Sequence, residues 1–407
     1  MNATHQRFVL PYSILHQVVL LLLISLHAAA QQPADTTGCT RAGAKNITAG
    51  GLKEGCWLEY VNNLDEIVTD TGAPYYMLTR YKNGMPQGIV RQYYRNGLLY
   101  FKIPYRNGLK EGVATGYDDN GKVHVEINYK AGKADGKKTE YYPGGKVMNA
   151  YIYRQDSLED TVFTYYPDGK PEMAVPYRNN KIDGTERSYY PGGQVSGETP
   201  YINGVRCGTG KGYYPDGAVQ RITRYKNDIP SGEEKEFYST GKLAQVNVYT
   251  GEDTRTTKMY YESGALQSVV PFSDYKKNGV EKDFYEDGKL MDEITYEDGK
   301  MNGTAKAYYE TGEVWRVMVL SNDMMNGPET MYYRNGRIML RSFYTNDTLD
   351  GTETIYYDNG KAEMESPYKK GLKNGTVKLY DKNGALLEED LYKDGVFIQA
   401  VKHGQDK

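Results

Sequence analysis

Tyrosine is the residue type in this sequence that is best suited to bind another molecule. The 407 residues include 41 tyrosines but only 8 phenylalanines and 2 tryptophans. Tyrosine rings can stack on sugars or pack against a protein, while their hydroxyls still reach water. One set recurs at a nearly constant spacing and predicts a surface stripe of ligand-binding rings: Tyr142, Tyr166, Tyr190, Tyr214, Tyr238, Tyr261, Tyr285, Tyr309, Tyr333 and Tyr357. The alternative is a structural role in which the rings only pack on one another across strands.

The acidic and histidine side chains do not form a pattern typical of catalysis. Single aspartates recur at turns about 9.6 Å apart, which is too sparse for Ca²⁺ because that ion needs six or more oxygen ligands. After residue 30 the only histidines are His124 and His403, and the usual metal, nucleophile and phosphate-loop motifs are missing. We therefore predict that the protein is not an enzyme and has no catalytic residue, cofactor or metal site.

Three cysteines follow the first 30 residues. A disulfide between Cys39 and Cys56 would close a short loop ahead of the repetitive part of the chain, and an exported protein permits such a bond. The pairing stays open at this point because its geometry cannot be derived from spacing. Cys207 is left over and is expected to be an exposed free thiol in a turn.

Composition and charge make some partners improbable. The formal net charge is −3, with 50 Lys and Arg against 53 Asp and Glu, and basic residues do not form runs longer than two. Electrostatic capture of nucleic acid or of an anionic membrane surface is therefore not predicted.

Residues 1–30 have the organisation of a secretory signal peptide. A weakly basic start with His5 and Arg7 precedes an apolar stretch at 18–26, and the alanines at 28–30 match the small-residue cleavage pattern. The apolar stretch is shorter than the roughly 20 residues of a spanning helix, so an uncleaved membrane anchor is the less favoured alternative. We expect an exported protein that is periplasmic, outer-membrane-associated or secreted, with no strong membrane signal after cleavage.

A 24-residue repeat dominates the rest of the sequence. The pattern aromatic-x-x-x-Gly occurs thirteen times, and every interval is 24 residues except the 23 between Phe237 and Tyr260. Twelve residues after each start stands a second aromatic, replaced once by Leu320. Such self-similarity is typical of repeat architectures. We divide the chain into the signal peptide (1–30), an N-terminal cap or linker with the possible disulfide (31–66), about thirteen repeats plus a partial copy (67–399) and a polar tail (400–407).

Each unit contains two turn signals and two stretches suited to strands. The first turn, as at residues 166–169, has proline and glycine where a tight turn needs them, and the second has Asn-Gly or Asp-Gly, which accept positive φ in hairpins. We therefore predict an all-β fold: an elongated, twisted, single antiparallel sheet of tandem 24-residue β-hairpins. At ~4.8 Å per strand, thirteen units would form a ribbon on the order of 125 Å long.

Alternation along the strands assigns the paired aromatics to different faces. The first is aromatic in all thirteen copies, so we expect it on the better-packed face. The second is tyrosine in eleven copies and aspartate at Asp118 and Asp381, so we expect it on the wetter face. An aliphatic residue two positions after the turn glycine, such as Val147, should pack beneath the first aromatic.

Two irregularities of the repeat lead to further predictions about the strands. Proline precedes the second aromatic in five copies and cannot donate to a strand ladder, so pairing should lapse or bulge there and the second strand should end or bend: Pro104, Pro176, Pro200, Pro271 and Pro367. The 23-residue interval and the degraded turn at 250–256 mark the weakest point of the array, and a bend is expected at that point.

The amino-acid sequence of the repeat resembles that of a known family. Residues 177–184, Tyr-Arg-Asn-Asn-Lys-Ile-Asp-Gly, lead into Tyr-Tyr-Pro-Gly-Gly at 189–193, and this pattern is similar to the variant MORN repeat of bacterial proteins of the YwqK-family antitoxin type. The resemblance covers roughly residues 67–399. It implies a ribbon of tandem β-hairpins, a MORN-like solenoid, and a role in binding partners or membranes rather than catalysis.

Two functional hypotheses follow. In the first, the protein is an exported scaffold that binds a protein partner along the tyrosine-rich sheet face. In the second, it is an adhesion module that binds carbohydrate or another envelope component; an antitoxin-like or immunity binding protein is a further alternative implied by the resemblance.

Overall fold

The computed structural model describes residues 38–403, so the predicted signal peptide lies outside the described residues, as do residues 404–407 of the expected tail. Within the described range every regular element is a β-strand. The strands are β1 Ile47–Ala49, β2 Leu52–Val61, β3 Ile67–Val68, β4 Tyr75–Lys82, β5 Met85–Tyr94, β6 Leu99–Arg106, β7 Leu109–Lys110, β8 Gly112–Tyr117, β9 Val123–Lys130, β10 Lys133–Tyr141, β11 Val147–Arg154, β12 Ser157–Tyr165, β13 Pro171–Arg178, β14 Lys181–Ile182, β15 Gly184–Tyr189, β16 Val195–Ile202, β17 Val205–Arg206, β18 Gly208–Tyr213, β19 Val219–Lys226, β20 Ile229–Pro230, β21 Gly232–Phe237, β22 Leu243–Tyr249, β23 Thr254–Tyr260, β24 Leu266–Ser273, β25 Lys276–Lys277, β26 Gly279–Phe284, β27 Leu290–Glu297, β28 Lys300–Tyr308, β29 Val314–Ser321, β30 Met324–Tyr332, β31 Ile338–Thr345, β32 Thr348–Leu349, β33 Gly351–Tyr356, β34 Ala362–Lys369, β35 Leu372–Lys373, β36 Gly375–Tyr380, β37 Leu386–Lys393 and β38 Val396–Lys402.

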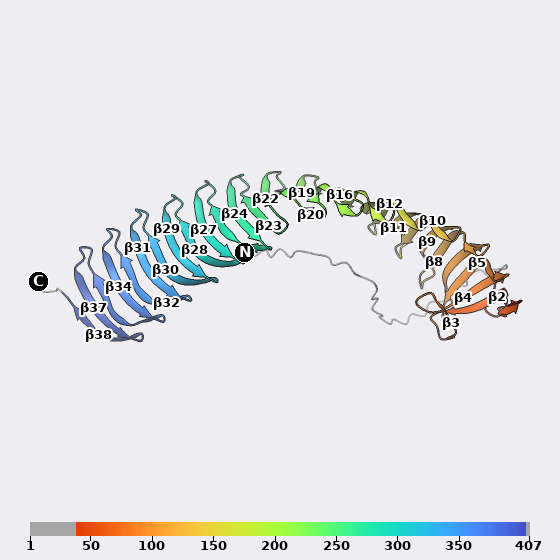
Figure 1. Cartoon of the computed structure of the whole chain (residues 1–407), viewed down its shortest axis with the longest axis horizontal. Helices are drawn as coiled ribbons and strands as arrows, with labels where there is room; N and C mark the ends of the chain where they lie inside the picture. Colours follow the sequence, from red (N-terminus) through yellow and green to blue (C-terminus); the bar gives the residue numbers. More distant parts are fainter. Residues whose placement is uncertain (1–37, 404–407) are drawn as a thin grey trace.

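These strands form one long antiparallel sheet that does not close on itself. Each long strand pairs with the long strands before and after it in the sequence, from β2 with β4 at one end to β37 with β38 at the other. The two-residue strands between them pair with the strand that precedes them, as β14 does with β13. Figure 1 shows the resulting elongated, curved and twisted ribbon, whose two ends lie far apart. The predicted fold class, a single all-β ribbon of tandem hairpins, is confirmed.

The first turn of each unit follows the paired aromatics. In the unit of β15 and β16, the Tyr190 N–H donates to the Gln194 carbonyl (2.8 Å), and the Gly193 N–H donates to the Tyr190 carbonyl (2.7 Å). Gly193 has φ 95°, a conformation that glycine adopts without a steric penalty. The aliphatic residue after the turn pairs with the first aromatic, as Val195 does with Tyr189, which agrees with the expected position of these side chains.

The second turn is a two-residue hairpin with positive φ at both central residues. In the same unit these are Asn203 (φ 52°) and Gly204 (φ 89°), between the paired residues Ile202 and Val205. This is the mirror-image turn whose twist matches that of the flanking strands. It confirms the reading of the Asn-Gly and Asp-Gly signals.

The expectation that the second strand ends or bends at proline is wrong. β16 continues through Pro200, which stays in register with Thr185 of β15. The irregularity lies in the following strand, where the Cys207 N–H donates to the Pro200 carbonyl (3.1 Å) and Gly208 adopts φ 111°. The pairing is therefore irregular beside the proline, which has no N–H to donate, but the irregularity is a bulge in the neighbouring strand. The other four prolines also stay paired within their strands: Pro104, Pro176, Pro271 and Pro367.

The interior of the ribbon is thin because a single sheet has no second layer to pack against. The buried apolar residues are mostly small, such as Ala114, Val162 and Val377, and several central positions are filled by buried polar groups such as Thr257 and Glu329. Both aromatics of each pair are half-buried in every unit. The expected contrast between a well-packed first ring and a wet second ring is therefore not observed.

The ribbon curves continuously rather than bending at the 23-residue interval. β22 and β23 remain paired in register from Gln245 with Met259 to Tyr249 with Arg255, and the arc in Figure 1 passes smoothly through them. The irregularity is instead confined to the connecting loop at residues 250–253, where the Thr250 N–H donates to the Thr254 carbonyl (3.1 Å).

Candidate functional site

The second tyrosines of the first turns form a regular row. We call it the tyrosine row, and it comprises Tyr94 and the ten tyrosines of the predicted stripe: Tyr142, Tyr166, Tyr190, Tyr214, Tyr238, Tyr261, Tyr285, Tyr309, Tyr333 and Tyr357. Each of the eleven hydroxyls donates a hydrogen bond to the backbone carbonyl of the first aromatic in the following unit, at 2.6 to 3.2 Å. The row therefore connects every unit that contains it to the next.

Because of these hydrogen bonds, the hydroxyl and the ring of each row tyrosine have different roles. The donor of each hydroxyl is already used within the protein, so a ligand would meet mainly the exposed part of a half-buried ring. The bond also fixes the orientation of each ring. The row is thus a structural feature in the first place, and binding of a ligand along it stays a prediction.

Aspartate takes the place of the row tyrosine in two units and stabilises its own turn instead. The Asp381 carboxylate accepts from the N–H groups of Asn383 and Ala385, each at 2.8 Å. The hydrogen bond from Ala385 is the main cause that holds the pKa of Asp381 below its ordinary value. Asp118 makes the equivalent bonds to Asn120 and Lys122.

Some of the first aromatics reach backward along the ribbon to carboxylates of the preceding unit. The Tyr141 hydroxyl donates to Glu126 (2.7 Å), and the Tyr308 hydroxyl donates to Glu293 (2.7 Å). Burial, together with the bond to Glu293, raises the pKa of Tyr308 to about 12. In units such as those of Tyr141 and Tyr308, the paired aromatics therefore connect the unit to both of its neighbours.

A second set of rings runs along the middle of the ribbon, one per unit at the position twelve residues after the first aromatic. Cations cover several of these rings: Arg206 lies 4.7 Å from the Tyr225 ring centre, Arg255 lies 4.5 Å from that of Phe272, and Lys277 lies 4.7 Å from that of Tyr296. Where the aromatic is missing, Leu320 fills the space and is buried.

Carboxylates lie among these rings in closed hydrogen-bond networks. Glu234 accepts from the Asn247 amide (2.8 Å), the Tyr249 hydroxyl (3.1 Å) and the Thr223 hydroxyl (2.7 Å). Burial and the negative charge of Glu234 raise the pKa of Tyr249 to about 12. Glu281 is likewise buried and is paired with Lys277.

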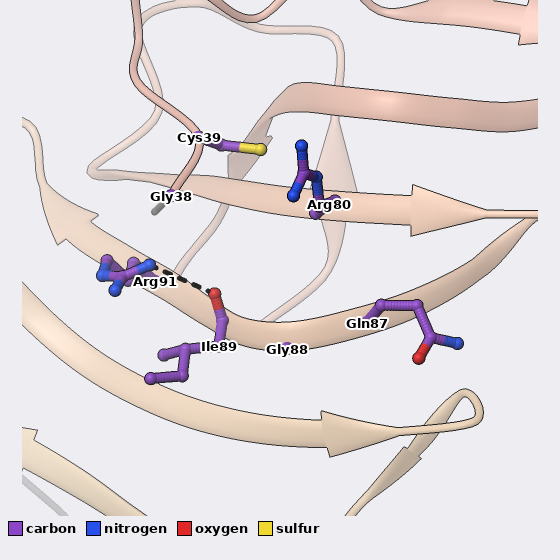
Figure 2. A pocket seen from close by; sticks show the side chains of 7 residues that line it. All are labelled: Gly38, Cys39, Arg80, Gln87, Gly88, Ile89 and Arg91. Atoms are coloured by element: carbon purple, nitrogen blue, oxygen red, sulfur yellow. Dashed lines mark hydrogen bonds between the residues drawn. The ribbon is translucent and has the colours of Figure 1, made fainter. Parts of the chain in front are cut away.

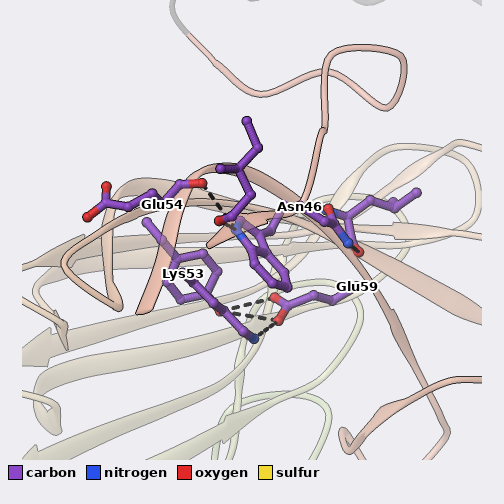
Figure 3. Close-up of polar contacts among 8 residues, drawn as sticks. Asn46, Lys53, Glu54 and Glu59 are labelled. Carbon is purple, nitrogen blue, oxygen red and sulfur yellow. Dashed lines mark hydrogen bonds and ion pairs between the residues drawn. The ribbon is translucent and has the colours of Figure 1, made fainter. Parts of the chain in front are cut away.

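The N-terminal end of the ribbon is closed by a similar network, shown in Figure 3. Glu59 is 5% exposed and is bonded by Lys53 and by the Tyr81 hydroxyl (3.1 Å). The Lys53 ammonium also lies 4.8 Å from the Trp57 ring centre. The Trp57 indole N–H donates to the Ile47 carbonyl (3.0 Å), which ties β1 to β2. This cluster covers the first strands of the sheet.

Cys39 and Cys56 form a disulfide with their Cα atoms 5.4 Å apart, whereas Cys207 is a free, half-buried cysteine. A shallow hollow of about 350 Å³ lies beside Cys39, and Figure 2 shows Arg80, Gln87 and Ile89 among the side chains that line it. β2, which carries Cys56, is paired with β4 along its length. The ribbon therefore begins within the 31–66 segment.

The two-residue turns form a hydrogen-bonded stack along one edge of the ribbon. From Gly84 onward the second residue of each two-residue turn, except the turn at 274–275, donates its N–H to a carbonyl of the preceding unit, as Gly204 does to Ile182 (2.7 Å). Where that residue is aspartate, its side chain also accepts from the preceding unit, as Asp228 does from the Arg206 N–H (2.9 Å). This turn stack is regular over most of the chain.

The turn stack is interrupted at the 23-residue unit. Pro230 occupies the position whose carbonyl accepts from the next turn in other units, as the Pro86 carbonyl does from the Gly108 N–H (3.2 Å). In the described part of the chain, no backbone N–H of residues 250–253 reaches the Pro230 carbonyl. On the far side, the Asp274 N–H donates to the Asp253 carbonyl (3.0 Å). The missing contact opens the edge of the ribbon at this point.

Three adjoining hollows lie at this interruption, with volumes of about 250, 430 and 640 Å³. The largest lies over the sheet between β19 and β26, and it shares Tyr249, Arg255 and Tyr275 with the smallest. We call these two connected spaces the interruption hollow. Its walls combine aromatic rings with charged and amide side chains.

Tyr275 is the most unusual residue of this site. It occupies the second position of its turn with φ 62° and is 74% exposed. Every other two-residue turn in the described chain has glycine, asparagine or aspartate at this position. A bulky aromatic residue in the left-handed region is strained, and such outliers concentrate at functional sites.

The tyrosine spacing did not point to the interruption hollow. The 23-residue interval and the degraded turn marked its position as an irregularity, but only the three-dimensional turn stack shows that Pro230 and residues 250–253 fail to meet. The local signal was Tyr275 itself, an aromatic in a hairpin position that normally requires glycine or asparagine.

Across residues 38–403 no group of three or more His, Cys, Asp or Glu side chains is arranged to hold a metal ion. His124 stacks near Tyr100, with ring centres 6.5 Å apart, and His403 contacts Glu389 at 3.0 Å. A search of the same range finds no helix with the length and apolarity needed to cross a membrane.

Comparison with protein families matches the chain to the MORN repeat variant in eight segments, seven of which run from one two-residue turn to the next and one of which, 230–249, ends at the loop 250–253: 86–107, 110–131, 182–203, 206–227, 230–249, 277–298, 349–370 and 373–394. No curated protein matches the chain. The finer likeness to YwqK-family antitoxins stays a prediction.

Two solved structures are similar to parts of the chain, the crystal structures of TcdB2-TccC3-TEV and TcdB2-TccC3-Cdc42. Both are 12% identical to it, and they cover 83% and 81% of the chain with TM-scores of 0.15 and 0.12. The chain spans about a quarter of those structures, 24% and 23% of their lengths. Likeness at this level carries no argument about function.

Proposed function

Because the chain is a MORN-repeat protein, and such repeats generally bind proteins or membranes, we propose that it is an exported, non-catalytic scaffold that binds a protein partner along the tyrosine row. The observation that carries the proposal is the fixed orientation of the row. Eleven hydroxyl-to-backbone bonds hold half-buried rings at a constant repeat.

A row of this kind is suited to a long, shallow contact with another protein. Tyrosine offers a large contact area with few side-chain torsions to immobilise, and it is enriched at protein interfaces. The hydrogen bonds reduce the ordering cost further because the rings are already held in place. The surface is extended rather than enclosed, which fits a macromolecular partner better than a small substrate.

The test compares two triple variants in the middle of the row. Tyr166, Tyr190 and Tyr214 are changed together to alanine, which removes the rings, or to phenylalanine, which keeps the rings and removes the inter-unit hydrogen bonds. Mature protein carrying each change is used to capture partners from envelope extract, and captured proteins are identified by mass spectrometry. The proposal expects a specific partner that the phenylalanine variant still captures, with lower affinity because its rings are no longer held by hydrogen bonds, and that the alanine variant loses.

Equal capture by the alanine variant would contradict binding along the row. Circular dichroism of both variants shows whether the ribbon is intact, so that loss of capture is not confused with unfolding. Retention of glycans rather than proteins, abolished by the same alanine changes, would favour the carbohydrate-binding alternative.

Export rests on the signal-like residues 1–30 and has its own test. When the full chain is expressed in a bacterial host with its first 30 residues, the product recovered from the periplasm or medium should begin near residue 31. Accumulation of the uncleaved chain in the cytoplasm would contradict the proposed export.

A further inference from the structure

We infer that the interruption hollow is a binding site for a neutral oligosaccharide. This site is separate from the tyrosine row and does not depend on the proposed protein partner. It is defined by an exposed aromatic platform, Tyr275, beside a patch of planar polar side chains on β19, β21 and β22.

Tyr275 supplies the apolar part of the site. Its ring is 74% exposed and lines both parts of the hollow, and its hydroxyl forms no hydrogen bond within residues 38–403. The residue is held in a strained conformation (φ 62°) where glycine, asparagine or aspartate would relieve the strain. An exposed ring in this position contributes little to folding, which leaves binding as its physical use. The C–H face of a pyranose ring is a natural partner for such a platform.

The polar part of the site is a cross-strand row. Arg221 on β19 is in register with Glu236 on β21, and Glu236 is in register with Gln245 on β22. All three line the hollow. Guanidinium, carboxylate and amide groups are planar and present adjacent donors or acceptors. Neighbouring hydroxyls on a sugar ring have the matching geometry, since each can both donate and accept.

The groups around this row are pre-organised. Asn247 is held by Glu234 (2.8 Å) and by the Thr257 hydroxyl, which donates to its side-chain oxygen (2.7 Å). Arg255 lies over the Phe272 ring, and its Nε atom is buried without a hydrogen-bond partner in the described structure. The hollow therefore has a rigid floor and an unsatisfied donor.

The balance of charge favours a neutral ligand. Three basic side chains line the larger space, Arg221, Arg255 and Lys277, together with three acidic ones, Glu234, Glu236 and Glu281. Neither a strongly anionic nor a cationic ligand gains net attraction from such a set. An added peptide strand is excluded at this place because β21, β22, β23 and β24 are paired on both sides.

The hollow is also confined to one place along the array of repeats. It arises where the four-residue loop 250–253 and the one-residue shortening of the unit leave the Pro230 carbonyl without the hydrogen bond that joins one turn to the next elsewhere. A site of this kind occurs once on the ribbon, whereas the tyrosine row continues along it. Saccharide binding should therefore have one strong site per chain.

The test measures binding of the mature chain to immobilised neutral hexasaccharides of glucose, galactose, mannose and N-acetylglucosamine, with a sulfated polysaccharide as the charged comparator. The inference expects retention by at least one neutral probe at one site per chain. Tyr275→Gly should weaken that binding at least tenfold while the melting temperature stays the same or rises, because glycine relieves the strain. Gln245→Ala should weaken it several-fold.

The matched control is Asp323→Gly, which makes the same type of change at the same turn position in another unit and should alter the affinity by less than twofold. Three results would overturn the inference: no retention by any neutral probe, retention by the sulfated polymer alone, or undiminished binding by Tyr275→Gly. None of these outcomes bears on capture of a protein by the tyrosine row, so the two proposals fail independently.

Discussion

At the scale of single residues, the tyrosine row shows how one side chain can serve both folding and binding. The hydroxyl of Tyr214 donates to the Phe237 carbonyl (2.8 Å) and so joins two units, while its ring remains half-exposed. Folding therefore constrains the hydroxyl, and any partner would use the ring. A substitution that separates the two groups can measure each contribution.

Tyr214→Phe removes the hydroxyl and should lower the free energy of unfolding by about 1 kcal/mol, the typical net value of one intramolecular hydrogen bond. Tyr214→Ala should cost more, because the ring contacts are lost as well. Urea denaturation of both variants provides the comparison. Tyr275→Phe is the control, since that exposed hydroxyl forms no hydrogen bond in the described part of the chain, and it should leave the unfolding free energy unchanged. A similar loss in the control would show that the row bonds are not the cause.

The sequence predicted where the row tyrosines stand but not what their hydroxyls contact. The 24-residue spacing is sufficient to place Tyr166 or Tyr190 at equivalent positions, because translation along a ribbon preserves position. The acceptor is a backbone carbonyl of the next unit, and its distance depends on the twist and curvature of the sheet, which spacing does not determine. For the same reason Tyr275 could not be recognised as part of a hollow.

At the scale of the strands, each proline that precedes the second aromatic of a unit is matched by a glycine in the following strand. Gly184 has φ 129°, and a Cβ atom there would lie 2.9 Å from the Cγ atom of Pro176. The glycine thus provides both the backbone conformation of the bulge and the space for the proline ring. Sequence reasoning noted the prolines but not their partners, because the bulge belongs to another strand.

Gly184→Ala should therefore destabilise the ribbon by about 2 to 3 kcal/mol, through backbone strain plus the clash with Pro176. The control is Gly232→Ala, which has φ 71° and no atom within 4 Å of the new Cβ, and which should cost only about 1 kcal/mol. Chemical denaturation separates the two. Adding Pro176→Ala to Gly184→Ala should recover part of the difference, and equal losses in both single variants would argue against the steric term.

At the scale of the whole molecule, the high tyrosine content makes stability sensitive to alkali. Burial, with nearby charges and rings, raises the pKa of Tyr94, Tyr249 and Tyr308 to about 12, whereas tyrosine in an unfolded chain has a pKa of about 10. Below pH 10 both states keep the phenolic proton and the contribution to stability is complete. Between pH 10 and 12 the unfolded chain loses protons that the folded chain retains, so stability falls as the pH rises.

The measurement is the free energy of unfolding in urea at a series of pH values from about 8 to about 11, together with the ultraviolet absorbance of phenolate in the folded protein. We expect a constant value up to about pH 9.5 and a decline above it. Tyr249→Phe should make the decline shallower, because one such group is removed. A stability that is flat or rising above pH 10 would be incompatible with the raised pKa values.

Because each unit contacts only its neighbours, the ribbon should tolerate the removal of one complete repeat. Deleting residues 285–308 joins Phe284 directly to Tyr309 and restores the aromatic-Tyr-x-x-Gly turn. β26 would then pair with β29 in place of β27, and the Tyr309 hydroxyl would keep its acceptor, the Tyr332 carbonyl. The shortened chain should fold cooperatively and be ~9.6 Å shorter, two strand spacings, in its maximum dimension by small-angle X-ray scattering.

Deleting only residues 285–296 is the matched control, because it removes half a unit and joins β26 to β28, two strands that run in the same direction. Antiparallel pairing could continue only if the rest of the ribbon turned over, which would exchange its two faces and misplace every ring beyond the junction. This variant should aggregate or lose its circular dichroism signal for strands. If it were as stable as the 24-residue deletion, the unit of folding would be the single strand rather than the repeat. The row of inter-unit hydrogen bonds would then not be what keeps the ribbon in register.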